Sequence, residues 1–232
     1  KKGGIPMNYQ LIKTTEELSS YLPKLLQAHQ IAVDTETTGL DPYTSRLRLI
    51  QLCVKDMPIL VIDCDTFLPE GRDICNLIFD SGRVKVFQNA KFDLKFLWKN
   101  QIAVKPPIFD TMLAGALLRS SGGPRSVSMQ TLAEHYLSEQ ISKEERQTNW
   151  GGPLREEQIL YAAKDAEVTL RLREAMIPHL LRNRLKEVAK LEFDCAFAVA
   201  QMEYNGIYLD LPKWESLTQK IQEEQQQALE KI

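Results

Sequence analysis

The sequence predicts an α/β fold in which a central β-sheet is flanked by helices and followed by a helical C-terminal extension. Three observations predict it: short apolar runs of strand character between residues 31 and 63, alternating helix and strand patterns between residues 70 and 100, and an almost entirely helical pattern after Asp110. The 232 residues, 44% of them hydrophobic and 26% charged, are enough for one large domain or one and a half.

The first hundred residues contain the strand signals. Thr14 or Thr15 can cap a helix that carries leucines at 18, 22, 25 and 26. Three strand-like runs separated by turn residues follow at 31–33, 46–55 and 58–63, and they predict a β-meander. A helix at about 70–79, a strand at 84–87 and a helix at 91–100 then give the alternation that is typical of an α/β sheet.

The second half is helical, with a long segment at about 154–180 and a further amphipathic helix that ends near Asn205 and Gly206. We expect the main domain at 7–185 and a helical extension at 186–232. Residues 1–6 (KKGGIP) are interpreted as a cloning remnant or the cut end of a longer protein. The last residues stop within a helical pattern without a capping signal, so we expect the parent protein to be longer.

Charge and composition exclude several classes. Twenty-nine basic and 31 acidic residues give a formal net charge of −2, so no overall positive field would hold a polyanion. No run approaches the roughly 18 apolar residues of a membrane span, and no signal core follows the N-terminus. The four scattered cysteines do not suggest a disulfide scaffold, and the motifs of P-loop, Rossmann, serine hydrolase and zincin enzymes are absent. We expect a soluble, monomeric protein of the bacterial cytoplasm, or of an organelle in a eukaryote.

The first candidate site is DTETTGL, which begins at Asp34. Asp34 and Glu36 follow an apolar run and lie two residues apart, so both side chains point to one face of a strand end. Two carboxylates held so close repel each other, and a divalent cation removes that penalty by taking oxygen ligands from both. A solvated strand end is the alternative interpretation.

Two further segments carry acids. In QNAKFD, a strand ends, Asn89 is expected to cap the next helix, and Asp93 falls in its first turns, near the carboxyl edge of the sheet. In YAAKD, Tyr161 and Asp165 lie four residues apart on one helix face. Taken alone, Asp93 could be a helix-start residue and the Tyr161–Asp165 pair a polar stripe.

Taken together, the three segments resemble the DEDD superfamily of 3′→5′ exonucleases, in the branch that has tyrosine beside the fourth acid. The texts DTETTGL, QNAKFDLKFL and YAAKDAEVTL are similar to its three motifs, and the spacings of 57 residues from Glu36 to Asp93 and 72 from Asp93 to Asp165 agree with it. This resemblance extends from about Tyr9 to the end of the chain.

The resemblance implies an RNase H-like exonuclease fold with a central mixed β-sheet, and hydrolysis of the 3′-terminal nucleotide with two divalent cations, Mg²⁺ or Mn²⁺. Asp34 would bridge both cations, Glu36 and Asp165 would complete one, and Asp93 would act through water at the other. Tyr161 would orient the attacking water. The weaker assignments are substrate contacts: Thr38 and Leu40 at the terminal nucleotide, Asn89 and Phe92 along the path of the strand. Leu40 and Phe92 could equally be core residues.

Two relatives within the superfamily compete. The tail LEFDCAFAVAQMEYNGIYLDLPKWESL is similar to the junction where the polymerase of family A (polymerase I type) DNA polymerases begins. It favours a proofreading exonuclease of DNA replication and repair that acts on single-stranded or frayed 3′ ends, with a polymerase domain in the parent chain. This chain carries no polymerase motif. The alternatives are a stand-alone exoribonuclease like ribonuclease D, which NWGGPLREEQIL resembles somewhat more, and a non-catalytic binding domain of the same fold.

Overall fold

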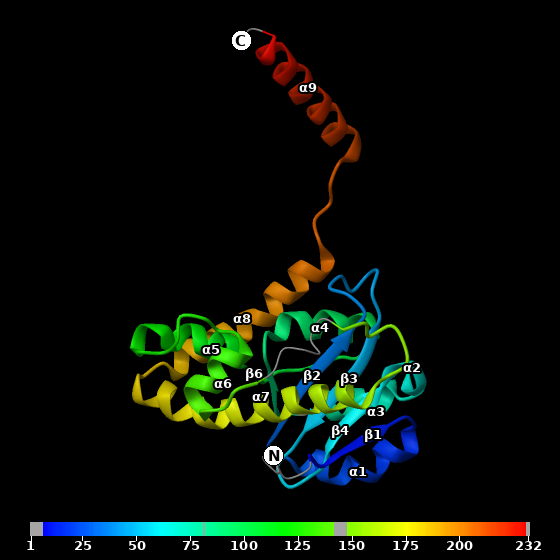
Figure 1. Cartoon of the computed structure of the whole chain (residues 1–232), viewed down its shortest axis with the longest axis vertical. Helices are drawn as coiled ribbons and strands as arrows, with labels where there is room; N and C mark the ends of the chain where they lie inside the picture. The colour runs from blue at the N-terminus through cyan, green and yellow to red at the C-terminus, as the bar shows by residue number, and fades with distance from the viewer. Residues whose placement is uncertain (1–6, 81, 142–147, 231–232) are drawn as a thin grey trace. The chain divides into compact units, whose positions relative to one another are not determined.

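A computed structural model describes residues 7–80, 82–141 and 148–230. The chain divides between Gln201 and Met202 into two compact units. The first holds the sheet and most helices, and the second holds the end of one helix and one further helix (Figure 1). Residues 1–6, interpreted above as a remnant, lie outside the described residues.

Within the described residues, six strands form one mixed sheet in the order β1-β4-β3-β2-β5-β6. The meander β2-β3-β4 is antiparallel, and β1, β5 and β6 pair in parallel with β4, β2 and β5 respectively. The strands are β1 Tyr9–Ile12, β2 Gln30–Thr37, β3 Leu47–Cys53, β4 Ile59–Asp63, β5 Val84–Phe87 and β6 Ile108–Asp110. Every residue of β3 and β4 is buried, because helices cover both faces of the sheet.

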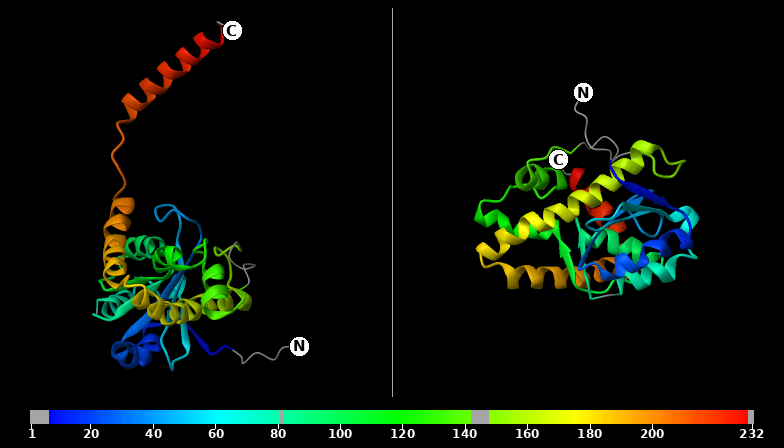
Figure 2. Two further views of the ribbon diagram at one scale, coloured as in Figure 1. Left: turned by 90° about the vertical axis from the view of Figure 1, so that its left-hand side faces the viewer. Right: turned by 90° about the horizontal axis from the view of Figure 1, so that it is seen from below.

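The helices of the first unit form two layers, one on each side of the sheet (Figure 2). They are α1 Thr15–Gln27, α2 Cys64–Phe67, α3 Arg72–Phe79, α4 Ala90–Lys99, α5 Thr111–Leu118, α6 Met129–Leu137, α7 Glu156–Arg182 and α8 Lys186–Asn205, with a 3-10 turn at Arg119–Ser121. Helix α7 packs on β2, β3 and β4 and also contacts α5 and α6. Helices α1, α3 and α4 lie on the opposite face.

The local sequence explains the helix positions that matter here. Thr14 and Glu17 form a capping box at the start of α1, which buries Leu18 and Leu25 on one side. In α8, Phe193 packs on Phe109 of β6 and Phe197 on Trp98 of α4, with ring centroids 4.8 and 6.4 Å apart. These contacts attach α8 to the first unit, which includes this helix up to Gln201. The expected domain division at residue 185 stays a prediction, because compactness does not define where a neighbouring domain begins.

The predicted meander, the strand at 84–87 and the helices near 15–26, 70–79, 91–100 and 154–180 are confirmed, with ends that move by a few residues. The short strands β1 and β6 and the helix α2 were not predicted. The cysteines are all free, and Cys195 is exposed whereas the other three are buried. Among the described residues, no helix is both long and apolar enough to cross a membrane. In the second unit, Asp210 caps α9 (Leu211–Leu229), which buries no residue.

Candidate active site

A cleft of about 580 Å³ opens at the edge of the sheet where β2 and β5 end. Its lining comes from β2 and the loop after it, the junction of β5 and α4, helices α5, α6 and α7, and the segment before α7. Every site residue that the sequence predicts lines this one cleft: Asp34, Glu36, Thr38, Leu40, Asn89, Phe92, Asp93, Tyr161 and Asp165. The fold therefore brings Asp34 and Asp165, which are 131 positions apart in the sequence, to the same cleft.

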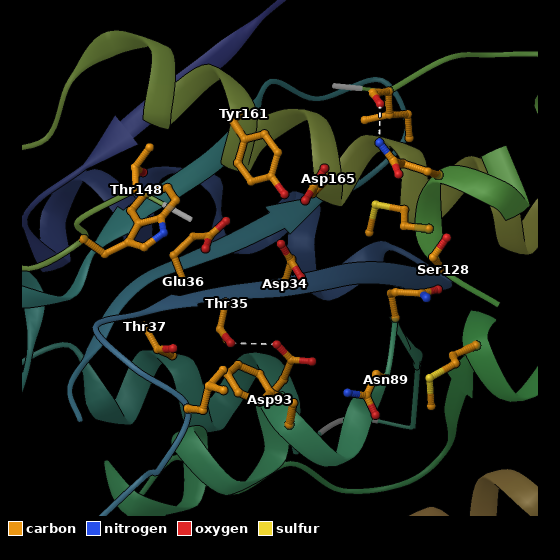
Figure 3. A pocket seen from close by; sticks show the side chains of 18 of the residues that line it. Asp34, Thr35, Glu36, Thr37, Asn89, Asp93, Ser128, Thr148, Tyr161 and Asp165 are labelled. Atoms are coloured by element: carbon orange, nitrogen blue, oxygen red, sulfur yellow. Dashed lines mark hydrogen bonds between the residues drawn. The ribbon is translucent and has the colours of Figure 1, made fainter. Parts of the chain in front are cut away.

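Three of the four acids converge. Asp34 and Glu36 project from the same face of β2, and Asp165 projects toward them from α7 (Figure 3). One carboxylate oxygen of each residue lies within 4.8 Å of the other two. Oxygen ligands at this separation can share a hard divalent cation, so the cluster can hold a metal ion.

Asp93 is the fourth acid, and it takes a different position. It lies in the first turns of α4 with 2% of its surface exposed. Its Oδ1 accepts a 2.6 Å hydrogen bond from the hydroxyl of Thr35, whose side chain points away from α7 (Figure 3). The negative charge of Asp93 raises the pKa of Asp34, so the two carboxylates interact. Asp93 nevertheless lies outside the three-acid cluster.

Burial and mutual repulsion make this site unfavourable for negative charge. Burial raises the pKa of Asp34 well above its ordinary value, and the charges of Asp93, Asp165 and Glu36 raise it further. Burial also raises the pKa of Asp93, although the hydrogen bond from Thr35 opposes this. A divalent cation would relieve the repulsion, and the donors are all carboxylate oxygens, so these residues fit Mg²⁺ or Mn²⁺ better than a softer metal.

Tyr161 lies on α7 one turn before Asp165, and its hydroxyl points toward the Asp165 carboxylate (Figure 3). The hydroxyl is hydrogen-bonded to that carboxylate. Burial raises the pKa of Tyr161, and the charges of Asp165, Glu36 and Asp34 raise it further. The hydroxyl therefore stays protonated at neutral pH and can donate or accept a hydrogen bond, but it cannot act as a base there.

The junction of β5 and α4 corrects one prediction. Asn89 occupies the N-cap position of α4 in the left-handed conformation (φ 68°), but its side chain makes no capping hydrogen bond. The backbone N–H groups of Asn89 and Ala90 instead donate to the carboxylate of Asp110, at 3.2 and 2.8 Å. The cap comes from a residue about 20 positions away because β6 pairs with β5 and places Asp110 opposite Phe87.

The remaining predicted residues surround the opening. The backbone of Thr38 donates to the carbonyl of Arg46, and the backbone of Arg46 donates to the Thr38 hydroxyl, which closes the loop between β2 and β3. Leu40, in that loop, is 85% exposed, so it is not a core residue. Phe92 is half-buried and packs on Phe96 with centroids 5.1 Å apart, so it serves the core while lining the cleft.

Several lining residues escaped the sequence analysis. They include Thr35, Gln88, Met112, Met129, Thr148 and Trp150. Thr35 and Gln88 lie within DTETTGL and QNAKFD, and Trp150 lies within NWGGPLREEQIL, so these quoted segments could have identified them. Met112 and Met129 lie outside the quoted segments, and only the fold brings them to the cleft.

The chain matches one family model and several known proteins. A family model described as 3′-5′ exonuclease matches residues 9–181. DNA polymerase I of Borreliella burgdorferi is 32% identical over 215 residues, which cover 88% of this chain and 23% of that protein. Ribonuclease D of Desulfotalea psychrophila is 27% identical over 177 residues, which cover 76% of this chain and 46% of that protein. The chain thus spans less than half the length of these relatives.

Solved structures of related enzymes have the same fold. The crystal structure of Escherichia coli RNase D has a TM-score of 0.76 at 25% identity and covers 92% of this chain and 55% of its own. Brucella melitensis NrnC bound to pGG has a TM-score of 0.74 at 24% identity, with 86% and 95% covered. The observed mixed sheet with flanking helices is therefore the RNase H-like exonuclease fold. Since the family model spans most of the chain, the chain belongs to the 3′-5′ exonuclease family, of the DNA polymerase I and ribonuclease D type, and is a nuclease.

Proposed function

We propose that this chain removes nucleotides one at a time from the 3′ end of DNA, with two divalent cations held by its acids. The observation that carries the proposal is the convergence of Asp34, Glu36 and Asp165 within 4.8 Å, with Asp93 beside Asp34 in the same cleft. Asp34 would serve both cations, Glu36 and Asp165 would complete one site, and Asp93 would act at the other. The cations, when bound, supply an activated water and stabilise the leaving 3′ oxygen.

The residues of the chain have separate tasks in this proposal. The Tyr161 hydroxyl, held by Asp165, positions the attacking water as a hydrogen-bond partner. Leu40 is exposed at the mouth of the cleft and would contact the terminal base, with Thr38 beside the terminal nucleotide. Asn89 and Phe92 line the path that the preceding nucleotides would follow.

DNA is proposed as the substrate because a DNA polymerase I matches 88% of this chain at 32% identity. On that basis we also infer a proofreading role in replication and repair, a polymerase domain in the parent chain, and a monomeric protein of the bacterial cytoplasm or of an organelle. The second candidate is an exoribonuclease, since ribonuclease D matches 76% of the chain.

Two comparisons test the proposal: single-stranded or mismatched ends against matched duplex ends, and DNA against RNA. A paired 3′ end must unstack and separate before it can enter the cleft, at a cost of about 1–3 kcal/mol per step. Single-stranded and terminally mismatched DNA should therefore be degraded faster than blunt, matched duplex, and DNA at least as fast as RNA of the same sequence. All four substrates would be compared at one salt concentration. A clear preference for RNA would favour the ribonuclease D type of activity, and equal rates on matched duplex and single strand would contradict the requirement for fraying.

A further inference from the structure

Gln51 on β3 lies directly opposite Asp34 in the antiparallel pairing of β2 and β3. Residues directly opposite in such a pair point to the same face of the sheet, with Cβ atoms about 4.5–5.5 Å apart. The side chain of Gln51 is therefore on the same face of the sheet as the side chain of Asp34, the face that α7 covers. In this structure the amide makes no hydrogen bond to Asp34, so the two side chains would have to turn toward each other to form one.

The amide of Gln51 is completely buried, with 0% of the residue exposed. Among the described residues, neither its Nε2 nor its Oε1 has a hydrogen-bond partner. Thr169 lies on α7 one turn beyond Asp165, and its hydroxyl is likewise buried without a partner in the described part of the chain. Unpartnered polar groups thus occur on the strand side and on the helix side of the acid cluster.

A buried amide without partners lowers the stability of the folded state, because folding removes it from water without compensation. The other inward positions of β3 are apolar, as Leu49 and Cys53 illustrate on the same face. A methionine or leucine at position 51 would fill the same volume without that loss. The position of the amide, beside an acid that would ligate metal, points to a role in the site and not in packing.

We propose that Gln51 is a positioning residue for Asp34: in the metal-bound site its Nε2 would donate a hydrogen bond to a free lone pair of the Asp34 carboxylate, and so fix the orientation of that carboxylate. Carboxylates that ligate metals are themselves commonly held by hydrogen bonds, and loss of such a partner costs about 10- to 100-fold in metal affinity or activity. This inference rests on the proposed function, because it assumes that Asp34 ligates a cation.

The test uses the full chain and the variant Gln51→Met, which keeps the volume and removes the donor. The matched control is Leu52→Met, because Leu52 is the next residue of β3, is equally buried and faces the opposite side of the sheet. Binding of Mn²⁺ alone is titrated by electron paramagnetic resonance, melting is followed in chelator, and cleavage is measured against metal concentration.

We expect Gln51→Met to weaken Mn²⁺ binding by about 10- to 100-fold, to melt in chelator no lower than the wild type, and to regain most of its kcat at saturating metal. Leu52→Met should bind Mn²⁺ as the wild type does. Gln51→Leu, as a second variant without the donor, should behave like Gln51→Met.

Three results would overturn the inference: unchanged Mn²⁺ affinity in Gln51→Met, a change no larger than that of Leu52→Met, or a loss of affinity that only follows a lowered melting temperature. A wild-type chain that binds no Mn²⁺ would instead contradict the proposed function itself. The two failures are therefore distinguishable.

Discussion

The hydroxyl of Tyr161 lies beside three carboxylates, those of Asp165, Glu36 and Asp34, and each of them disfavours the tyrosinate. Burial acts in the same direction and is the largest cause of its raised pKa. At the scale of single residues, this separates the tyrosine from the acids: it contributes a fixed hydrogen-bonding group, whereas the acids contribute negative charge.

Tyr161→Phe keeps the ring and its packing and removes only the hydroxyl. We expect kcat to fall by roughly 10- to 1000-fold, the range of a group that positions a reactant or assists proton transfer, with little change in metal affinity. Because the tyrosine does not titrate near neutral pH, the shape of the pH profile should be retained. Steady-state cleavage of single-stranded DNA at saturating metal measures this.

Tyr136→Phe is the matched control, since Tyr136 is also half-buried with a pKa raised by burial but does not line the cleft. If Tyr161→Phe retained full activity, as Tyr136→Phe should, the hydroxyl of Tyr161 would have a structural role alone.

At the scale of elements, Asp110 ties two helices to the end of the sheet. Its carboxylate accepts hydrogen bonds from Asn89 and Ala90 at the start of α4, and from Met112 and Leu113 at the start of α5, at 2.8 to 3.2 Å. Helix α4 carries Asp93 and α5 contributes Met112 to the cleft. One buried carboxylate therefore fixes the entry of two elements that form the site.

Asp110→Asn replaces one acceptor oxygen by an amide nitrogen that cannot accept. Leaving buried N–H groups unpaired costs about 1–3 kcal/mol, which for a chain of this size lowers the melting temperature by roughly 2–4 °C for each kcal/mol. We also expect reduced kcat, because Asp93 moves with α4. Thermal unfolding and cleavage assays measure the two effects.

Asp210→Asn serves as the comparison, because Asp210 caps α9 through a backbone N–H and asparagine caps a helix about equally well. If Asp110→Asn lowered the melting temperature no more than Asp210→Asn does, the cap that Asp110 provides to α4 and α5 would contribute little to stability.

The same region shows what the sequence can and cannot predict. The positions of α1, α4, α7 and β5 follow from apolar periodicity within one segment, and the start of α1 also follows from its capping residue Thr14. The strand β6 spans only Ile108–Asp110, too short for a period to be read. The cap that Asp110 provides depends on the pairing of β6 with β5, which no local pattern contains.

In the candidate site, too, some features could be predicted from the sequence and others could not. Alternation along β2 predicts that Asp34 and Glu36 share a face, and helical spacing predicts that Tyr161 and Asp165 do, and the structure confirms both. The hydrogen bond between Asp93 and Thr35 was not predictable, because it depends on how α4 packs beneath the strand. That the Gln51 amide lacks a hydrogen-bond partner among the described residues likewise follows only from its burial and register in the structure.

At the scale of the whole molecule, the acid cluster makes stability depend on pH. Burial raises the folded-state pKa values of Asp34 and Asp93 above those of the unfolded chain. The folded state therefore binds protons more tightly, so this contribution to stability is complete below about pH 4 and is lost as the pH rises through the raised values. In chelator, the melting temperature should fall as the pH rises from about 5 toward 8.

A divalent cation should reverse that trend, because it competes with protons for the same oxygens. At 100 times the dissociation constant, binding adds about 2.7 kcal/mol of stability, and the gain should be larger at pH 7.5 than at pH 5.5. Melting curves with Mg²⁺ and with EDTA at several pH values test this, with Asp34→Asn as the variant that should reduce the pH dependence. An equal Mg²⁺ effect at every pH would contradict the raised pKa values.

If the acid cluster drives metal-dependent hydrolysis from the 3′ end, chelation and loss of Asp34 should each abolish shortening of a labelled strand. A 5′-labelled single strand is incubated with the wild type, with Asp34→Ala and with Asp73→Ala, an exposed acid on α3, in Mg²⁺ or Mn²⁺ and then in EDTA. We expect a ladder shortened from the 3′ end that disappears in EDTA, a loss of several orders of magnitude in rate for Asp34→Ala, and no loss for Asp73→Ala. A ladder that persists in chelator, release of the label from the 5′ end, or full activity of Asp34→Ala would contradict this mechanism.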